Sequence, residues 1–334
     1  MRIIVPMAGM GKRMRPHTLT IPKPLIPIAG KPIVQRLVED IAKVCNQQVE
    51  EVAFIIGRFG EEVEKKLLSI ATSVGAKGTI YYQDQPLGTA HAILCAAPSL
   101  KGNLVVAFAD TLFKADFKLD TSPDGTIWVQ KVEDPRPFGV VTVDDKGYIT
   151  KFVEKPDTFV SDLAIIGIYY FKDGEYLKNE CQYLIDNNIK DKGEFQLTNA
   201  LDNMKNKGSK FIPGQVSEWL DCGNKDSTVQ TNERYLEFIK HEELISKNAS
   251  LHHSVIIPPV YVADNVQIVN SVIGPHVSIG KGTKISDSIV KKSIIQENAI
   301  IKNAIIDNSM VGNYAHYECK PADLSIGDYN VIKS

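Results

Sequence analysis

A group of glycines and cations near the start of the chain combines the residue types that bind phosphate. Gly9, Gly11, Lys12 and Arg13 follow directly on the apolar run Ile3-Ile4-Val5. Because glycine has no Cβ, backbone N–H groups in such a turn can approach a phosphate closely. The spacing lacks the third glycine of the dinucleotide fingerprint and the hydroxyl residue of the Walker pattern. The segment is therefore predicted to be a phosphate-binding loop of another kind.

A further cation stands on a stiff segment after this loop. Lys23 lies between two prolines in Pro22-Lys23-Pro24-Leu25, and proline restricts both its own φ and the residue before it. The segment could therefore return Lys23 to the loop, where Lys12, Arg13 and Arg15 already stand. A lone glycine-rich basic turn could be only a solvated loop, but this set of cations suits a triphosphate.

This stretch resembles the signature of the sugar-1-phosphate nucleotidylyltransferases, G-x-G-T-R followed by P-K-P-L and then K-P. The resemblance implies that Arg13 is the catalytic arginine and Lys23 a catalytic, phosphate-binding lysine. It also implies that Ala8, Gly9, Gly11 and Lys12 contact the nucleotide. Lys12 replaces the threonine common in the family and adds charge to the loop.

A second segment resembles the part of the family that recognises the base and ribose. It runs from Gln83 through Leu87-Gly88-Thr89 to His91. A glutamine amide can both donate and accept hydrogen bonds on a base edge, so Gln83 suits this role chemically. Taken alone, the segment would be a loop followed by a helix N-cap.

Two aspartates are candidates for a metal site. Asp110 ends an apolar run, where a carboxylate is costly to bury unless it is paired or binds a metal; Asp221 lies in Trp219-Leu220-Asp221-Cys222-Gly223. The resemblance implies that Asp110 is the family's magnesium aspartate and Asp221 the second one. Mg²⁺ takes few protein ligands and keeps several waters, so two carboxylates beside a triphosphate suit it. Either aspartate alone could be a cap or turn residue.

The sugar-phosphate pocket is expected between these aspartates. Phe138-Gly139-Val140 and Glu154-Lys155-Pro156 resemble the family's Y-G-V and E-K-P elements, which implies that Gly139 and Glu154 hold sugar hydroxyls and Lys155 holds the sugar phosphate. Gly167 interrupts an apolar strand where a ligand could approach closely. The segment from Glu194 resembles G-E-x-x-x-T-D, but Asn199 replaces the aspartate, and we expect no catalytic role there.

Elements that alternate between strand and helix must position these residues. The pattern predicts strands at 3–5, 52–56, 79–83 and 104–109, and helices at 61–73 and 89–97. A further helix is expected to open at Lys31-Pro32, because proline is favoured at the first helical position and apolar residues recur at helical spacing from Ile33 to Val44. Such alternation indicates an α/β fold with a doubly wound, mixed and mostly parallel sheet. Ligands in these sheets bind beyond the carboxyl ends of the strands, where the glycine loop must lie.

A polar helix is predicted from about 226 to 246, and short β-branched doublets follow it. Ser254-Val255-Ile256, Ser271-Val272-Ile273 and Ser288-Ile289-Val290 recur 17 residues apart, and Ile273, Ile279 and Ile285 recur every sixth residue. A period of six residues nested in a period of about seventeen residues indicates a solenoid in which each coil has three sides. This pattern is similar to the short left-handed β-helix of many family members. We therefore expect a catalytic domain at 1–247 and a β-helix domain at 248–334.

Composition excludes several other classes of protein. The formal net charge of −2 gives no electrostatic basis for binding nucleic acid or an anionic membrane. The five cysteines are odd in number and contain no C-x-x-C, which favours reduced thiols and a cytoplasmic location. No apolar run reaches the length of a membrane span.

The expected function is Mg²⁺-dependent nucleotidyl transfer from a nucleoside triphosphate to a sugar-1-phosphate. Gln83 and Leu87-Gly88 resemble the thymidylyl and uridylyl branches, which favours glucose-1-phosphate with dTTP or UTP. Mannose-1-phosphate with GTP and N-acetylglucosamine-1-phosphate with UTP stay open. A non-catalytic regulatory relative and a hexapeptide acyltransferase are alternatives of other classes. We expect the coils to support homo-oligomer formation.

Overall fold

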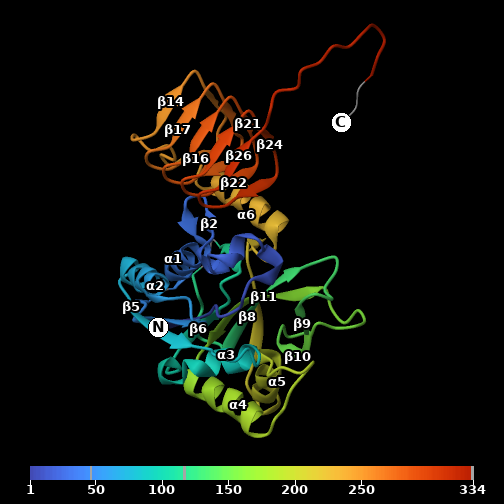
Figure 1. The fold of residues 1–334 in the computed structure, drawn as a ribbon. Helices are drawn as coiled ribbons and strands as arrows, with labels where there is room; N and C mark the ends of the chain where they lie inside the picture. The colour runs from blue at the N-terminus through green and yellow to red at the C-terminus, as the bar shows by residue number, and fades with distance from the viewer. Residues whose placement is uncertain (46, 116–117, 332–334) are drawn as a thin grey trace. The chain divides into compact units, whose positions relative to one another are not determined.

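The computed structural model describes residues 1–45, 47–115 and 118–331 (Figure 1). These residues form two compact units. The first contains Met1–Ile26 and residues 31–227, and the second contains Pro27–Gly30 and the residues from Thr228 onward. A short early segment therefore belongs to the later unit. The domain boundary expected between residues 247 and 248 stays a prediction.

The first unit is built on a mixed, mostly parallel sheet with the strand order β10-β9-β11-β6-β1-β4-β5, and β8 and β12 extend it beside β11. The parallel strands are β1 (Arg2–Pro6), β4 (Glu51–Ile56), β5 (Lys77–Tyr82) and β6 (Leu104–Ala107). The remaining strands are β8 (Gly125–Lys131), β9 (Gly139–Val143), β10 (Ile149–Glu154), β11 (Leu163–Phe171) and β12 (Phe211–Gln215). The predicted fold class is confirmed.

Helices cover both faces of this sheet (Figure 1). On one face lie α1 (Ile33–Val44) and α2 (Glu61–Ser73), and on the other lie α3 (Thr89–Cys95), α4 (Gly174–Asp186) and α5 (Leu197–Asn206). The helical spacing of apolar residues in α1 buries Ile33, Leu37 and Ile41 completely or nearly so. β1 and β4 read as continuous apolar runs because both of their faces are covered.

Two short strands lie next to the candidate metal-binding aspartates: one begins directly after Asp110, and the other ends at Asp221. They are β7 (Thr111–Lys114) and β13 (Glu218–Asp221), and they pair in antiparallel fashion. β3 (Lys31–Pro32) leads into α1. The chain thus brings residues near 110 and near 221 onto neighbouring strands.

The predicted helix over 226–246 is too long. α6 spans Lys225–Phe238, and the chain then turns. The N–H of Val262 donates to the carbonyl of Leu244, and the N–H of Ser246 donates to the carbonyl of Val262, both at 2.9 Å. Residues 244–246 pair with a strand of the second unit, and this tertiary pairing overrides the helical character of a polar segment.

The second unit consists of three stacks of short parallel strands, as the repeat predicts. One stack is β14 (Ser250–His252), β17 (Gln267–Val269), β20 (Lys284–Ser286), β23 (Ile300–Lys302) and β26 (His316–Glu318). The second is β15 (Val255–Ile256), β18 (Val272–Ile273), β21 (Ile289–Val290) and β24 (Ile305–Ile306), and the third is β16 (Val260–Val262), β19 (Val277–Ile279), β22 (Ser293–Ile295) and β25 (Ser309–Val311). The hairpin strand β2 (Pro27–Ile28) also belongs to this unit.

Serine side chains link successive coils of this unit. The N–H of Ser271 donates to Ser254 Oγ, and the N–H of Ser288 donates to Ser271 Oγ, each at 3.1 Å. Inward-facing residues such as Ile268, Ile285 and Ile301 are at most 1% exposed and form the core of the coils. In the described part of the chain, none of the helices combines the length and the apolar character that a membrane span requires.

Candidate active site

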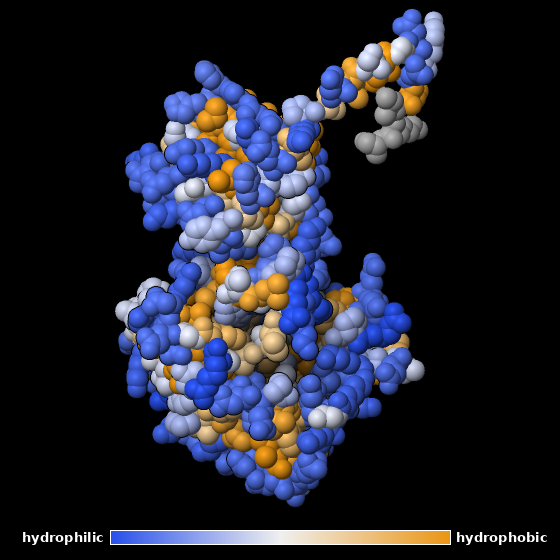
Figure 2. Space-filling view, in the orientation of Figure 1, coloured by the Kyte–Doolittle hydropathy of each residue, from blue (hydrophilic) through white to orange (hydrophobic). Residues whose placement is uncertain are grey.

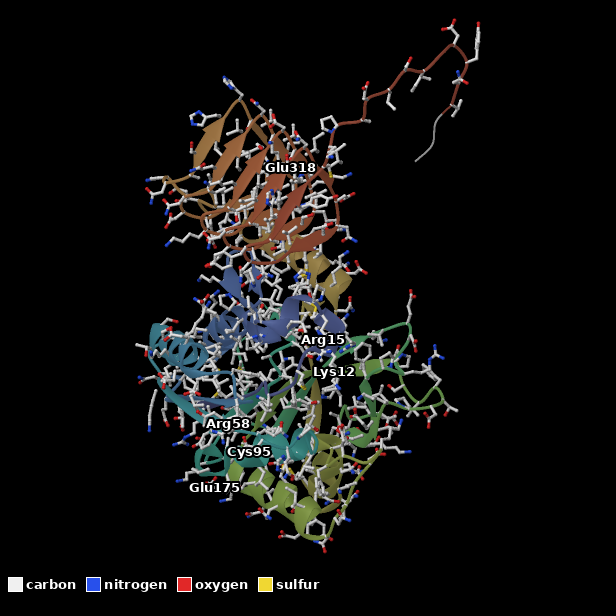
Figure 3. The ribbon with its side chains drawn as sticks, viewed as in Figure 1. Lys12, Arg15, Arg58, Cys95, Glu175 and Glu318 are labelled. Atoms are coloured by element: carbon white, nitrogen blue, oxygen red, sulfur yellow. The ribbon has the colours of Figure 1, made fainter. Side chains whose placement is uncertain are left out.

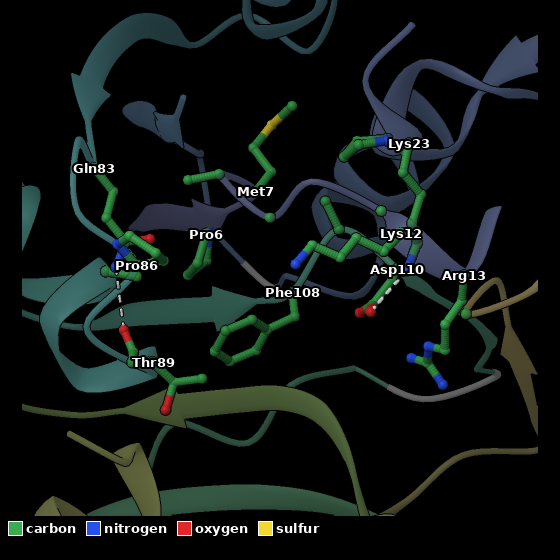
Figure 4. Close-up of a pocket in the computed structure, with 18 of the residues that line it drawn as sticks. Pro6, Met7, Lys12, Arg13, Lys23, Gln83, Pro86, Thr89, Phe108 and Asp110 are labelled. Carbon is green, nitrogen blue, oxygen red and sulfur yellow. Dashed lines mark hydrogen bonds and ion pairs between the residues drawn. The ribbon is translucent and has the colours of Figure 1, made fainter. Parts of the chain in front are cut away.

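A cavity of about 410 Å³ lies beyond the carboxyl ends of the parallel strands in the first unit. Ten of the predicted site residues line it, and Figure 4 shows many of them facing a common space. They are Ala8, Gly9, Gly11, Lys12, Arg13, Lys23, Gln83, Gly88, Thr89 and Asp110. The loop after β1, the turn before α3 and the end of β6 thus meet, as a doubly wound sheet requires.

The glycine loop has a fixed shape. Gly11 has a φ of +58°, and a Cβ there would lie 3.0 Å from both Lys23 Cβ and Thr18 Cγ2. The Thr18 hydroxyl donates to the carbonyl of Gly11 at 2.8 Å. Only glycine combines this conformation with this close packing. Beyond it, Lys12 and Arg15 project from the same edge of the first unit (Figure 3).

Lys23 and Asp110 form an ion pair inside the cavity. Lys23 Nζ lies 2.9 Å from Asp110 Oδ2 (Figure 4), although the two residues are 87 positions apart. The lysine is only 8% exposed, whereas the aspartate side chain is 46% exposed. The buried cation is thus neutralised by a carboxylate that still faces the cavity.

Asp221 lies beside Asp110 through strand pairing. It is opposite Thr111 in the β7–β13 ladder, and the N–H of Cys222 donates to the carbonyl of Asp110 at 2.9 Å. Asp221 Oδ1 accepts the N–H of Gly223. A Cβ at Gly223 would lie 2.9 Å from that oxygen and 3.2 Å from Arg13 Nη2. Arg13 and Asp221 therefore flank one glycine, although Asp221 does not itself line the cavity.

The turn before α3 is locked against the segment that begins at Glu194. Gly88 has a φ of +119°, and a Cβ there would lie 2.5 Å from the carbonyl oxygen of Phe195. Thr89 Oγ1 accepts the N–H of Leu197 at 2.8 Å. These contacts fix the position of the turn relative to α5.

Gln83 uses its amide nitrogen within the protein. Nε2 lies 3.2 Å from the carbonyl oxygen of Gly88 and 3.0 Å from His91 Nδ1. Burial lowers the pKa of His91, which favours a neutral ring that can accept this hydrogen bond. The amide oxygen of Gln83 is then left to accept a hydrogen bond from a ligand.

The predicted sugar-binding residues form a second cluster. A Cβ at Gly139 would lie 3.1 Å from Glu154 Oε2, and the Thr198 hydroxyl donates weakly to the same oxygen at 3.4 Å. Lys155 Nζ lies 3.7 Å from Glu154 Oε1. Burial raises the pKa of Glu154. Gly167 does not line the cavity itself. Its carbonyl accepts the N–H of Phe108 at 2.9 Å, and Phe108 lines the cavity.

A buried tyrosine connects the two clusters electrostatically. Burial raises the pKa of Tyr169, and the negative charges of Glu154 and Asp110 raise it further. Its ring meets Phe108 edge to face, with 6.1 Å between the centroids. The charges of the sugar cluster and of the Lys23–Asp110 pair therefore both act on one phenol.

Some predicted site residues do not line the cavity, and some residues that line it were not predicted. Six predicted residues do not line it: Leu87, Gly139, Glu154, Lys155, Gly167 and Asp221. Nine residues without a predicted role do: Pro6, Met7, Pro24, Pro86, Ala92, Phe108, Ala109, Glu194 and Gly223. Glu194 stands in the segment that resembles G-E-x-x-x-T-D, which is the signal that could have identified it.

Metal ligation at this site would rest on a pair of carboxylates. Among residues 1–45, 47–115 and 118–331, no group of three or more His, Cys, Asp or Glu side chains is arranged to hold a metal ion. Asp110 and Asp221 fit an ion such as Mg²⁺ that completes its coordination with water and phosphate oxygens. They suit Zn²⁺ less well, because zinc prefers nitrogen and sulfur ligands.

Comparison with family models gives two matches, which overlap at residues 230–237. The model described as "Nucleotidyl transferase" matches residues 3–237. The model described as "GlmU-like, C-terminal hexapeptide" matches residues 230–301. The first model covers the cavity and every predicted site residue.

Curated relatives and solved structures resemble the chain over most of its length. Glucose-1-phosphate thymidylyltransferase from Streptomyces antibioticus is 32% identical over 87% of this chain and 81% of the relative. A low-salt glycan biosynthesis nucleotidyltransferase from Haloferax volcanii is 31% identical over 73% and 69%. The bifunctional protein GlmU from Methanococcus vannielii is 29% identical, over 77% of this chain but only 61% of the relative.

A structure of UDP-glucose pyrophosphorylase complexed with UDP-glucose has a TM-score of 0.57. It is 24% identical and covers 71% of this chain and 98% of its own. At this identity the similarity supports the fold alone.

Proposed function

Since the chain belongs to the nucleotidyl transferase family, we propose that it transfers a nucleotidyl group from a nucleoside triphosphate to a sugar-1-phosphate. The observation that carries the proposal is the joint position of the glycine loop, Lys23 and Asp110 in one cavity. A non-catalytic relative would have no need to keep this set of cations and carboxylates together.

In the proposed reaction, a phosphate oxygen of the sugar-1-phosphate attacks the α-phosphorus of the triphosphate. The bond from the α-phosphorus to the bridging oxygen breaks, and pyrophosphate leaves with that oxygen and its electron pair. The protein aligns two anions and neutralises the charge that spreads over the phosphates. Arg13, Lys12 and the loop N–H groups hold the β- and γ-phosphates, and Lys23 steadies the α-phosphate.

Asp110 and Asp221 are the residues that would hold Mg²⁺. Asp221 ends β13, Asp110 directly precedes its partner strand β7, and Lys23 pairs with Asp110; carboxylates are the protein ligands that Mg²⁺ prefers. When bound, the ion would supply positive charge that stabilises the reacting phosphates.

The sugar-1-phosphate is assigned to the cluster of Gly139, Glu154, Lys155 and Gly167. The absence of a side chain at Gly139 leaves space beside the Glu154 carboxyl, which can accept two sugar hydroxyls. Lys155 offers a point charge to the sugar phosphate.

The proposed substrates are glucose-1-phosphate with dTTP or UTP. With its amide nitrogen engaged by Gly88 and His91, Gln83 offers an oxygen that can accept the N3–H of thymine or uracil. Guanine also presents N–H donors, so GTP with mannose-1-phosphate is the first competitor. N-Acetylglucosamine-1-phosphate with UTP is the second.

A product screen tests this proposal. The full chain is incubated with each of five nucleoside triphosphates and a panel of sugar-1-phosphates in the presence of Mg²⁺, and both pyrophosphate and nucleotide sugar are measured. We expect the highest kcat/KM with glucose-1-phosphate and dTTP or UTP. A higher value with GTP or with an N-acetylated sugar would contradict the substrate assignment, and no product from any pair would contradict the reaction.

A further inference from the structure

The corners of the second unit repeat one backbone feature. After each strand of the third stack, the chain turns through a residue in the left-handed region. These residues are Asn265, Gly282, Asn298 and Tyr314, with φ values of 58°, 71°, 55° and 57°. The corner conformation therefore marks each coil of the solenoid.

The chain carries this corner once more after its last coil. Ile326-Gly327-Asp328-Tyr329 repeats the pattern of Val311-Gly312-Asn313-Tyr314, 15 residues later. Tyr329 has a φ of 62°, a conformation that costs energy in a non-glycine residue. Residues 324–331 thus have the sequence and the local conformation of a further coil.

These residues nevertheless lie away from the coils of their own chain. They follow β26, whose last residue Glu318 is labelled in Figure 3, and run outward as an extended segment (Figure 1). Leu324 is 64% exposed, Ile326 49% and Val331 79%. Figure 2 shows the hydrophobic side chains along this segment in orange. An apolar, strand-like segment exposed in this way is unfavourable unless another surface covers it.

A shortened corner explains why the segment leaves its own solenoid. In three successive coils, the residue just before the third-stack strand is left-handed: His276, Lys292 and Asn308, with φ values of 62°, 41° and 44°. The chain advances six residues from Asn303 to Ser309, whereas it advances only five from the equivalent Cys319 to Leu324. Asp323 does not have a positive φ. Without that left-handed residue the chain continues straight instead of turning onto its own last coil.

The last coil presents hydrogen-bonding groups that match such a segment. Ser293 Oγ accepts the N–H of Ser309 at 3.1 Å, and Ser309 Oγ is the equivalent acceptor for the next coil. The N–H of Gln296 donates to the carbonyl of Val311 at 2.9 Å, whereas the equivalent N–H of Gly312 has no backbone partner in the described chain. The end of the solenoid is therefore an open strand edge.

We propose that residues 324–331 of one chain form the next coil on the open end of a second copy. Ile326 then lies over Val311 of the second copy, Tyr329 lies over Tyr314, and Gly312 donates to the carbonyl of Ile326. The second copy is the occupant because its open end repeats the register that the segment carries, while the shortened corner directs the segment away from its own end. Reciprocal exchange gives a closed two-chain assembly by strand addition.

Cross-linking between two variants that each carry one introduced cysteine tests the proposal. In this arrangement Ser325 lies beside Met310 of the second copy, both on the outer face of the third stack. Met310→Cys and Ser325→Cys are made separately in a Cys319→Ser background, co-expressed, and oxidised mildly. We expect a disulfide-linked species of about twice 37.0 kDa that neither variant forms alone.

The double variant, Met310→Cys with Ser325→Cys in one chain, distinguishes the alternatives. A cross-link confined to single chains would overturn the proposal, because the segment would then complete its own solenoid. No cross-link in either experiment would also overturn it.

The mass of the assembly in solution provides a second measurement. Ile326→Asp places a charge at the inward position and should shift the full-length protein from dimer to monomer in light-scattering chromatography. The matched variant Ser325→Asp changes an outward position and should keep the dimer. Equal masses for Ile326→Asp and the unmodified chain would count against the proposed contact.

Discussion

Asp110 has two tasks in this account: it neutralises buried Lys23, and it would hold Mg²⁺. Asp110→Asn removes the charge while keeping the size of the side chain. We expect kcat to fall by about 10²–10³, the usual cost of removing one charge-stabilising group, with an unchanged circular dichroism spectrum. The control Asp120→Asn alters an exposed carboxylate that accepts hydrogen bonds from Ser122, and it should keep the parent rate. A rate near the parent value for Asp110→Asn would refute this assignment.

Glu154 should make stability depend on pH in a direction opposite to that of most carboxylates. Because burial raises its pKa above the ordinary 4.5, the folded state binds the proton more tightly than the unfolded state. Stability therefore falls as pH rises from about the ordinary value through the raised pKa. Glu154→Gln cannot ionise and should lack this fall, which urea unfolding at a series of pH values would detect.

Glu175→Gln is the matched comparison for this measurement. The N–H of Gly102 lowers the pKa of Glu175, so that carboxylate stabilises the fold above its ordinary pKa and the benefit is lost as pH falls. The two variants should thus differ from the parent with opposite pH trends. Parallel trends would show that the burial of Glu154 does not govern its protonation.

Ten of the residues that line the cavity were predicted from the sequence. Many of them are cations, an aspartate or glycines, whose charge or missing side chain is evident without knowledge of their neighbours. The ion pair between Lys23 and Asp110 joins residues 87 positions apart, a distance that only the folded sheet closes. Phe108 and Glu194 were missed for a related reason. Phe108 follows a strand and Glu194 lies in a loop, and only the folded structure shows that both line the cavity.

At the scale of elements, the turn before α3 depends on the absence of a side chain at Gly88. Gly88→Ala adds a Cβ in the left-handed region against the Phe195 carbonyl. We expect a lower melting temperature and a raised KM for the nucleotide, because the turn that holds Gln83 must move. Gly60→Ala has a similar φ of +90° but open space around its Cβ, so it isolates the backbone strain. Equal losses in the two variants would contradict the packing argument.

Helices and strands with strong periodicity were predicted closely. The expected helix over 61–73 coincides with α2. The helix expected to open at Lys31-Pro32 begins one step later as α1, because Lys31–Pro32 forms β3. The polar segment after α6 was predicted less well, because its apolar residues Leu244 and Ile245 are too few to define a period. Their pairing with β16 is a tertiary contact that local sequence does not encode.

At the scale of the whole molecule, one buried side chain ties three distant segments of the second unit together. Asn232 of α6 accepts the N–H of Ala29 at 2.9 Å and the hydroxyl of Ser278 at 2.7 Å. Asn232→Ala should destabilise the unit by about 1–3 kcal/mol for each buried donor left without an acceptor, measured by urea unfolding. Asn187→Ala changes an exposed asparagine and should have an effect within about 0.5 kcal/mol. Similar values for the two variants would argue against this role.

The proposed enzyme transfers the α-phosphate together with its nucleoside, and the position of an isotope label reports this transfer directly. The full chain is incubated with sugar-1-phosphate, Mg²⁺ and either α-³²P-labelled or γ-³²P-labelled triphosphate. The account predicts that the α-label appears in the nucleotide sugar and the γ-label in pyrophosphate, in equal amounts and only when both substrates are present. Release of the γ-label as orthophosphate, or an α-label that never reaches the sugar, would contradict it.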